Sequence, residues 1–202
     1  MPDLSIQARP AFAGLMTPGR HGRTQGEAGV TLREVEGLGM ASVIARKGRA
    51  ADCAAALRRA LALDLPVTPR CAGTGDLRIL WAGPGQWMAR GTALDSDALA
   101  ERLAQALGGS ASVAAQGDGR AVLRIGGPRA RDTLAKGLAL DLHESVFKPG
   151  DVALTSIMHM GVHFWEVDAA PTYEIALFRS FAGSFWHWIA GAAAEFGCEV
   201  EE

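Results

Sequence analysis

A glycine pair between a predicted strand and a predicted helix is the first feature that could bind a ligand. The run is Gly126-Gly127-Pro128-Arg129, and backbone amides at the start of a helix can hold a phosphate group. It matches neither G-x-G-x-x-G nor G-x-x-x-x-G-K-S/T, and Pro128 lacks one of the amide donors that such a site uses. An earlier run of the same kind, Lys47-Gly48-Arg49, matches these patterns no better. Both runs therefore favour a structural turn over a phosphate site.

Histidines near one another in the second half are the next candidates, as metal ligands. His159 and His163 are four residues apart, a spacing that brings two side chains together on a helix but not in a strand-turn-strand around Gly161. His143 lies upstream, and no third ligand is evident. We therefore predict no metal site, and we expect His163, which alternates with Phe164, to be a half-buried residue of a sheet.

Nucleophilic chemistry has few candidates. Ser184 stands in Ala-Gly-Ser-Phe-Trp, which lacks the second glycine of a nucleophile elbow and falls within a predicted helix. None of the three cysteines has a sequence context that would make its thiolate reactive: Cys53, Cys71 and Cys198. We predict no catalytic residue and no cofactor-binding residue in this chain.

Two aspartates occupy matching places in a repeated Ala-Leu-Asp-Leu sequence. Asp64 and Asp141 each follow a predicted helix, where a short carboxylate bonds to the local backbone. A catalytic carboxylate pair is the alternative interpretation, and the pattern favours the helix exits.

These aspartates close the two copies of a longer pattern. The segments Ser42–Leu65 and Arg120–Leu142 both contain a strand, a glycine, Arg-Ala-x-Asp, an apolar helix and Ala-Leu-Asp-Leu. Around each copy the periodicity indicates a strand, a helix, two hairpin strands, a second helix and a further strand. We therefore predict an α+β fold of two pseudo-repeated split βαβ (ferredoxin-like) halves, with antiparallel sheets and helices on one face. The halves are expected to share a core or exchange an edge strand.

The predicted domain organisation is an irregular N-terminal arm, 1–29, followed by halves at 30–117 and 118–202. Ser96 with Asp97 is expected to cap the helix that ends at Leu107. The helix after Pro128 is expected to bury Ala130, Leu134 and Leu138. The acidic tail, 199–202, is expected to fray.

The N-terminal arm has two open interpretations. Leu4-Ser5-Ile6 could form an edge strand, but prolines and glycines interrupt anything longer. Phe12, Leu15 and Met16 are scattered apolar residues. The arm is either loosely packed or ordered by lying across a partner chain.

The predicted last helix, Ser180–Phe196, carries only one charged residue, Glu195. A helix without a charged face is usually covered on both sides. The second cover is either another subunit or the N-terminal arm. Tryptophan is enriched where protein interfaces contribute most binding energy. The residues that we predict at a subunit interface are Phe12, Trp186, His187 and Trp188.

Composition limits the class of protein. The chain has 202 residues, 49% of them hydrophobic, and a formal net charge of -2, so no overall field attracts nucleic acid or an anionic membrane. Three cysteines without close spacing indicate free thiols in a reducing compartment. We find no signal pattern and no apolar run long enough for a membrane span. We therefore expect a soluble cytoplasmic protein.

Several motifs together resemble the gamma subunit of bacterial heterotetrameric sarcosine oxidase. They are Arg120–Asp132, Leu134–Gly137, Leu140–His143, Trp81–Trp87 and Arg179–Trp188. The resemblance implies a fold related to the folate-binding domain of aminomethyltransferases. It also implies an assembly of alpha, beta, gamma and delta subunits, which oxidatively demethylates sarcosine to glycine and hydrogen peroxide, with formaldehyde or methylenetetrahydrofolate as the one-carbon product.

The same resemblance assigns the chemistry to other chains. It places FAD, FMN, NAD and the tetrahydrofolate site in the larger subunits and zinc in the delta subunit, and it makes the gamma chain structural. A K-G-C-x-x-G-Q motif of folate-dependent relatives is missing around the cysteines. The alternative is a free-standing tetrahydrofolate-binding aminomethyl or methyl transferase, with a pterin between the halves paired to Asp132 or Asp141. A homo-oligomeric stability module is a weaker third possibility.

Overall fold

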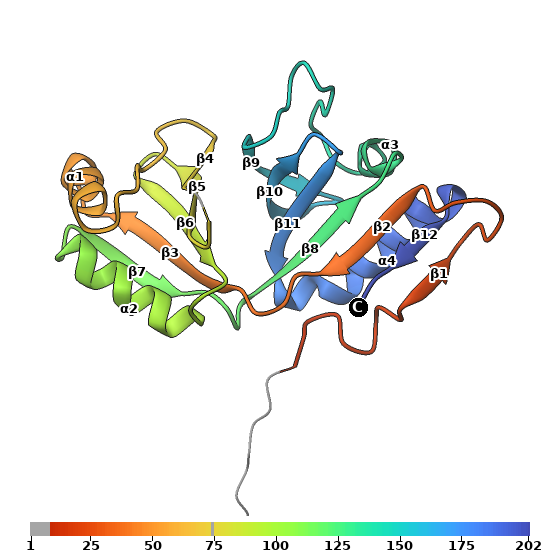
Figure 1. Ribbon diagram of the computed structural model, residues 1–202, viewed down its shortest axis with the longest axis horizontal. Helices are drawn as coiled ribbons and strands as arrows, with labels where there is room; N and C mark the ends of the chain where they lie inside the picture. The colour runs from red at the N-terminus through yellow and green to blue at the C-terminus, as the bar shows by residue number, and fades with distance from the viewer. Residues whose placement is uncertain (1–8, 74) are drawn as a thin grey trace, which may run out of the picture.

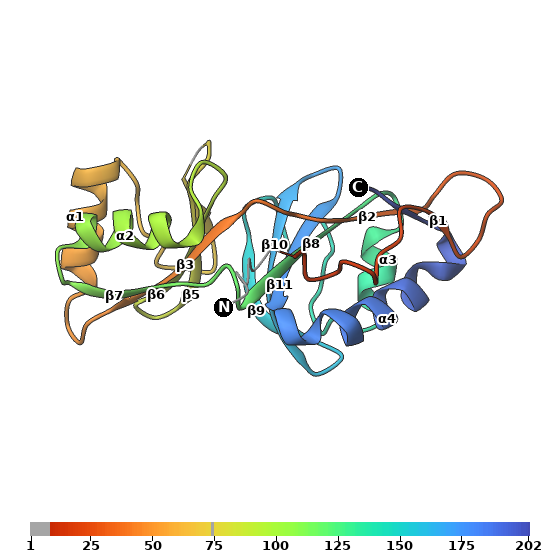
Figure 2. The same cartoon turned by 90° about the horizontal axis from the view of Figure 1, so that it is seen from below.

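The two strand-glycine-helix repeats each begin one half of the protein. The computed structural model describes residues 9–73 and 75–202, and the halves lie side by side (Figure 1, Figure 2). The first half contains β3 (Gly39–Ala45), α1 (Ala50–Leu61), β4 (Cys71–Ala72), β5 (Arg78–Gly83), β6 (Gln86–Gly91), α2 (Ser96–Leu107) and β7 (Ala111–Ala115). Its sheet has the order β4-β5-β6-β3-β7 with antiparallel neighbours, which is the predicted split βαβ arrangement with β4 added at one edge.

The second half repeats this topology with insertions. Its elements are β8 (Arg120–Gly126), α3 (Ala130–Ala135), β9 (Val152–Ile157), β10 (Met160–Asp168), β11 (Thr172–Phe178), α4 (Ala182–Ala193) and β12 (Cys198–Val200), with short 3-10 turns at Arg179–Phe181 and Ala194–Phe196. The sheet order is β1-β12-β2-β8-β11-β10-β9. Without β1 and β2, β12-β8-β11-β10 matches β7-β3-β6-β5, and β9 lies outside β10 as β4 lies outside β5. The predicted duplication is confirmed.

The Arg-Ala-x-Asp sequence in each copy has a local structural reason. Arg49 pairs with Asp52, and Arg129 pairs with Asp132 at 3.1 Å, in each case across the first turn of the helix. A carboxylate in that turn also opposes the positive end of the helix dipole.

The second copy of the helix is shorter than its sequence suggests. Helix α3 ends at Ala135, and a Cβ on Gly137 would lie 2.6 Å from the ring of Trp188, so the chain turns beneath that ring. The prediction that Leu138 continues the helix is wrong. Leu138 is buried, but it forms a β-bridge to Ile157.

Two strands come from the N-terminal third of the chain and join the second half. They are β1 (Gly19–His21) and β2 (Val30–Glu34). Strand β2 pairs with β8 and β12, so the predicted boundary of the first half at residue 30 is wrong. The halves share a core, which is one of the two predicted alternatives. Strand β2 is not the exchanged edge strand of the other alternative, because it lies inside the sheet between β12 and β8.

The arm ahead of β2 is ordered on its own chain. Phe12 is 1% exposed and belongs to the core of the second half, and the Glu34 carboxylate accepts the backbone amides of Ala11 and Phe12 at 2.8 and 3.0 Å. Strand β1 pairs with β12. Within residues 9–29, the arm is therefore packed against its own chain. Residues 4–6, the predicted edge strand, lie outside the described part of the chain.

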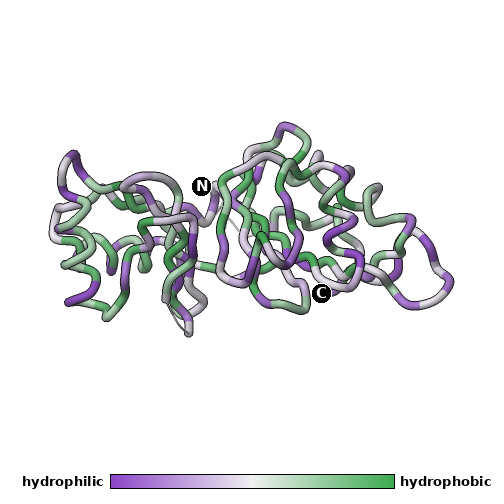
Figure 3. Tube along the Cα trace, turned by 90° about the horizontal axis from the view of Figure 1, so that it is seen from above, coloured by the Kyte–Doolittle hydropathy of each residue, from purple (hydrophilic) through white to green (hydrophobic). Residues whose placement is uncertain are grey.

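Each half keeps its helices on one face of its sheet, and the two opposite faces meet between the halves (Figure 1). Apolar segments run mainly through the interior of each half, and hydrophilic residues lie mainly in the outer loops (Figure 3). One helix end differs from its prediction, because Asp95 rather than Ser96 accepts the Ala98 amide, at 2.8 Å, while Ser96 Oγ accepts the Met40 amide. No helix among the described residues is long and apolar enough to cross a membrane.

The predicted fraying of the tail is wrong for residues 199 and 200, which belong to β12. Strand β12 lies between β1 and β2, and Val200 is 2% exposed.

Because Val200 is part of the core, we expect Val200→Ala to lower the free energy of unfolding by about 2 kcal/mol. Urea denaturation measures this change. Glu202→Ala, at an exposed position two residues later, is the control and should change stability by less than about 0.5 kcal/mol. Equal effects of the two variants would contradict the burial of β12.

Candidate functional site between the halves and along the last helix

The Gly126-Gly127 turn is occupied by contacts within the chain. Gly127 has a φ of +100°, and a Cβ there would lie 2.7 Å from the Gly29 carbonyl oxygen. The Arg129 amide, which would face a phosphate, donates to that same carbonyl at 2.9 Å. The run is a structural turn that fastens the start of α3 to the segment before β2.

The histidines do not come together. His143 forms a hydrogen bond with Ser145, and His159 lies in the two-residue turn between β9 and β10 with a φ of +66°. Within residues 9–73 and 75–202, no three His, Cys, Asp or Glu side chains gather in a way that could hold a metal ion.

The candidate nucleophiles lie apart from one another. Ser184 is exposed on α4. Burial raises the pKa of the Cys198 thiol to about 11, with a smaller contribution from Glu199, and burial also raises the pKa of Cys71. Buried Cys53 donates to the Ser110 carbonyl at 3.3 Å. The raised pKa values of Cys198 and Cys71 favour the protonated thiol over a thiolate nucleophile at these two positions.

The aspartates have local partners. The Asp141 carboxylate accepts the His143 amide at 2.9 Å, so the predicted bond to the local backbone is confirmed. The predicted place at a helix exit is wrong, because α3 ends at Ala135. Asp64 differs from that prediction, because it accepts from the Arg58 side chain at 2.6 Å. Asp132 pairs with Arg129 and is half exposed. The carboxylates proposed to pair with a pterin therefore have exposed, local contacts of their own.

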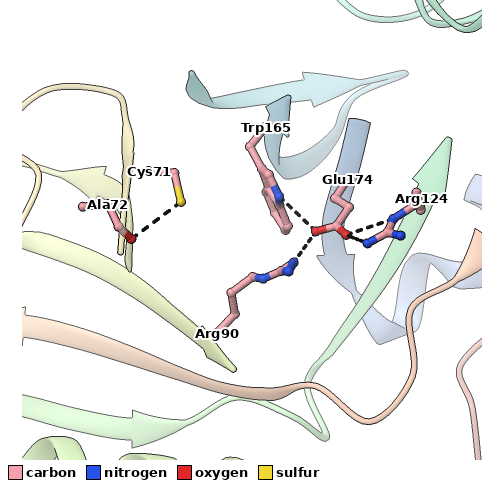
Figure 4. A network of polar contacts seen from close by, with 6 residues as sticks. All are labelled: Cys71, Ala72, Arg90, Arg124, Trp165 and Glu174. Carbon is pink, nitrogen blue, oxygen red and sulfur yellow. Dashed lines mark hydrogen bonds and ion pairs between the residues drawn. The ribbon is translucent and has the colours of Figure 1, made fainter. Parts of the chain in front are cut away.

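Two buried polar side chains, Glu174 and His163, lie at the interface between the halves. The apolar part of this interface is formed by side chains from both sheets, namely Met40, Leu80, Met88, Val122, Val152, Trp165 and Ala176. At one end of this shared core, the fully buried Glu174 of β11 projects toward the first half (Figure 4).

Glu174 holds arginines from both halves. One carboxylate oxygen accepts from Arg90 of β6 and from the Trp165 indole N–H at 3.0 Å. The other oxygen accepts from Arg124 of β8, through Nε at 3.1 Å and through Nη2 (Figure 4). Because Arg90 belongs to the first half and the other three residues to the second, this network fixes the two sheets relative to each other.

His163 makes a second polar link between the halves. It is 2% exposed, more deeply buried than predicted, and its Nε2 donates to the Trp81 carbonyl at 2.9 Å because a carbonyl can only accept. Burial lowers the pKa of His163 from its ordinary 6.5 to about 4. The Trp81 hydrogen bond opposes this shift, and the Arg120 charge adds to it. The imidazole is therefore neutral at pH 7.

Helix α4 presents an uncharged outer face, and its tryptophans are partly used within the chain. Trp186 packs edge-on against His21 at 5.9 Å between ring centroids, so the N-terminal segment covers part of it. Trp188 packs against Phe185, and both tryptophans contact the core. His187 is exposed. Of the four predicted interface residues, Phe12 is buried in the core of the second half and cannot contact another subunit. His187 is the most exposed of the other three.

The family of the chain follows from comparison with known proteins. A model of the sarcosine oxidase gamma subunit family matches residues 47–195, which is more than half of the chain. The chain belongs to this family. The sarcosine oxidase subunit gamma of Arthrobacter sp. is 32% identical over 173 residues, which are 83% of this chain and 81% of that protein.

Solved structures agree with the family and with the fold. A chain of the heterotetrameric sarcosine oxidase from Corynebacterium sp. U-96 superposes with a TM-score of 0.81 at 28% identity, covering 94% of this chain and 96% of that one. The glycine cleavage system aminomethyltransferase T of Bartonella henselae superposes with a TM-score of 0.63 at 18% identity, covering 86% of this chain and 48% of that one. The second match supports the fold alone. It confirms the prediction that the fold resembles that of an aminomethyltransferase.

Sequence reasoning missed the Glu174 network. A signal was present, since Glu174 is the only charged residue in the strand Thr-Tyr-Glu-Ile-Ala-Leu-Phe. A charge at that position needs a partner if the strand is buried. Its partners Arg90 and Arg124 are 84 and 50 residues away, so only the folded chain identifies them.

We expect Glu174→Gln to lower the free energy of unfolding by about 3 kcal/mol, because it leaves two partly buried arginines without their carboxylate. Urea denaturation followed by circular dichroism measures this loss. Asp64→Asn is the matched control, since it makes the same change in an arginine pair whose side chains are 71% and 69% exposed. It should cost less than about 1 kcal/mol. Similar losses in the two variants would show that Glu174 contributes no more than a surface pair.

We expect the contribution of His163 to stability to fall as the pH drops from about 6.5 toward 4. The unfolded chain binds a proton at the ordinary pKa of 6.5, and the folded chain binds it only near 4, so acid favours unfolding across that window. The full effect is about 3 kcal/mol. Glu166, whose pKa is raised chiefly by burial, acts in the opposite direction, so the comparison must be made between variants.

His163→Gln keeps a side-chain N–H donor but cannot titrate. The difference in unfolding free energy between wild type and this variant should therefore change between pH 7 and pH 4.5 by more than 1 kcal/mol, an order-of-magnitude figure. A difference that is independent of pH would contradict the depressed pKa.

Proposed function

We propose that this chain is a structural subunit of a heterotetrameric sarcosine oxidase that oxidatively demethylates sarcosine to glycine. The observation that carries the proposal is the match to a chain of a heterotetrameric sarcosine oxidase, at 28% identity over 94% of this chain. Membership in the gamma subunit family supports it. The partners would be the alpha, beta and delta subunits.

The chemistry would belong to the other subunits. FAD, FMN and NAD would be held by the larger chains and zinc by the delta chain, with tetrahydrofolate as co-substrate of the complex. This division is supported by the contacts of the candidate residues described above, because their polar groups are engaged in turns, helix ends and the link between halves. A cytoplasmic location is consistent with three unpaired thiols.

A free-standing folate transferase is less well supported. Its proposed pterin contacts, Asp132 and Asp141, are exposed and bonded locally. The shared face between the halves, where a pterin was expected, is filled by apolar side chains of both sheets.

A scaffold subunit must offer surfaces to its partners, and the outer face of α4 is one. Ser184, His187 and Gly191 lie along it, three or four residues apart, and all are exposed. Such a small, uncharged face lets another chain approach closely without burying an unpaired charge.

Co-expression tests assembly directly. The chain and its alpha, beta and delta partners are produced together with a tag on the alpha subunit, purified, and separated by size exclusion. We expect this chain to elute with the sarcosine-oxidising complex in an equal molar ratio. An active complex that elutes without the chain would overturn the proposal.

His187→Glu tests the α4 face. We expect this change to reduce recovery of the chain in the complex by about tenfold, because the added carboxylate would be desolvated in the contact. Thermal unfolding of the isolated variant should remain within a few degrees of wild type, as for most exposed positions. Ala104→Glu, at an exposed position of α2, adds the same group elsewhere and is the control. Normal assembly of the His187 variant would exclude this part of α4. Trp186 is a poorer probe, since it also packs on the core.

A further inference from the structure

The face of the second sheet that meets the first half is only partly covered. Its middle is occupied by the shared core. Beyond the end of that core, toward the start of β8 and the end of β11, an open groove of about 510 Å³ remains. The groove is formed by β8, β9, β10 and β11, and Gly161 and Ser156 form part of its floor.

The walls of this groove are apolar side chains with large exposed surfaces. Leu154 of β9 is 52% exposed, and Phe178 at the end of β11 is 47% exposed. Phe181 is 37% exposed and packs edge-on against Phe178 at 6.4 Å between centroids. Phe181 immediately precedes α4, so this exposed aromatic pair lies at the start of that helix.

One cation lies in the groove without a counter-ion. The Arg120 guanidinium lies over the Phe178 ring, with 4.0 Å between Cζ and the centroid. Its Nε is buried and has no hydrogen-bond partner within the described chain. Burial lowers the pKa of Arg120, and no nearby carboxylate offsets that effect. None of the residues that line the groove is acidic.

The charge of Arg120 and the apolar walls of the groove together indicate the kind of segment that could bind there. An arginine without a counter-ion attracts an incoming carboxylate, which the guanidinium can bind through charge-assisted hydrogen bonds. The apolar walls on either side favour a bulky hydrophobic group next to that carboxylate. The groove is shallow and open to solvent, which suits an extended segment of another chain better than an enclosed small molecule.

We infer that this groove receives a segment of a partner subunit in which a bulky apolar residue stands beside an aspartate or glutamate. The apolar side chain packs between Leu154 and Phe178, and the carboxylate accepts from Arg120. This inference rests on the proposed function, because it requires the assembly. The groove would be a second contact region besides the face of α4.

A competition experiment tests the groove. Wild type and a variant of different mass are co-expressed with the tagged alpha subunit and the beta and delta subunits, and mass spectrometry compares their ratio in the purified complex with that in the lysate. We expect Leu154→Asp and Arg120→Glu each to be depleted about tenfold in the complex. Ile44→Asp is the matched control, since Ile44 is a strand residue of similar exposure, 46%, in the first half. It should be incorporated like wild type.

The outcomes separate the groove from the proposed function. Absence of the wild-type chain from the complex would overturn the proposed function itself. Presence of wild type with equal incorporation of the Leu154 and Arg120 variants would overturn only the groove. Equal depletion of the Ile44 control would show that the depletion is not specific to the groove, and would overturn the inference. Thermal unfolding of each isolated variant shows whether depletion reflects loss of folding.

A cross-linking experiment tests the carboxylate independently of folding losses. Arg120→Lys keeps the charge and places a primary amine at the expected contact. Treatment of the assembled complex with a carbodiimide, which joins amines to carboxylates, should link this lysine to an aspartate or glutamate of a partner subunit. Wild type, whose native lysines are Lys47, Lys136 and Lys148, is the control for other cross-links. An assembled variant that gives no new link to a partner overturns the assignment of a carboxylate.

Discussion

The relative position of the two halves depends on one buried carboxylate. Glu174 is fully buried and accepts hydrogen bonds from Arg90 of the first half and from Arg124 and Trp165 of the second. A charge can remain in such a place only while its partners stay within hydrogen-bonding distance. The carboxylate therefore sets a stricter geometry than the apolar side chains around it, which tolerate small shifts.

The face of the second sheet that meets the first half has a covered middle and an uncovered end. The covered middle joins the halves through apolar packing and through the His163 link to Trp81. One uncovered end carries an unpaired arginine between exposed apolar side chains. The helices α3 and α4 occupy the opposite face of this sheet.

Local patterns predicted most elements because hydrophobic periodicity and turn residues act within a few residues. The repeated Arg-Ala-x-Asp identified two equivalent helix starts, and both form the same ion pair. Errors arose where distant chain segments meet. Helix α3 stops early because Trp188, more than 50 residues later, lies against Gly137. Strand β2 was assigned to the wrong half because its pairing with β8 crosses the whole first half. The candidate site was predicted less well, since Phe12 proved to be buried and Glu174 was not considered.

The sequence by itself determined the duplicated α+β halves, the absence of a recognisable catalytic motif and, through several motifs, the family. These properties depend on residue types at short spacing, which the chain carries before it folds. Only the tertiary structure decided that the N-terminal arm completes the second half, that Glu174 joins the halves, and that Arg120 lies unpaired beside Phe178. Burial and long-range pairing depend on which segments meet, and a local pattern contains no record of a partner 80 or more residues away.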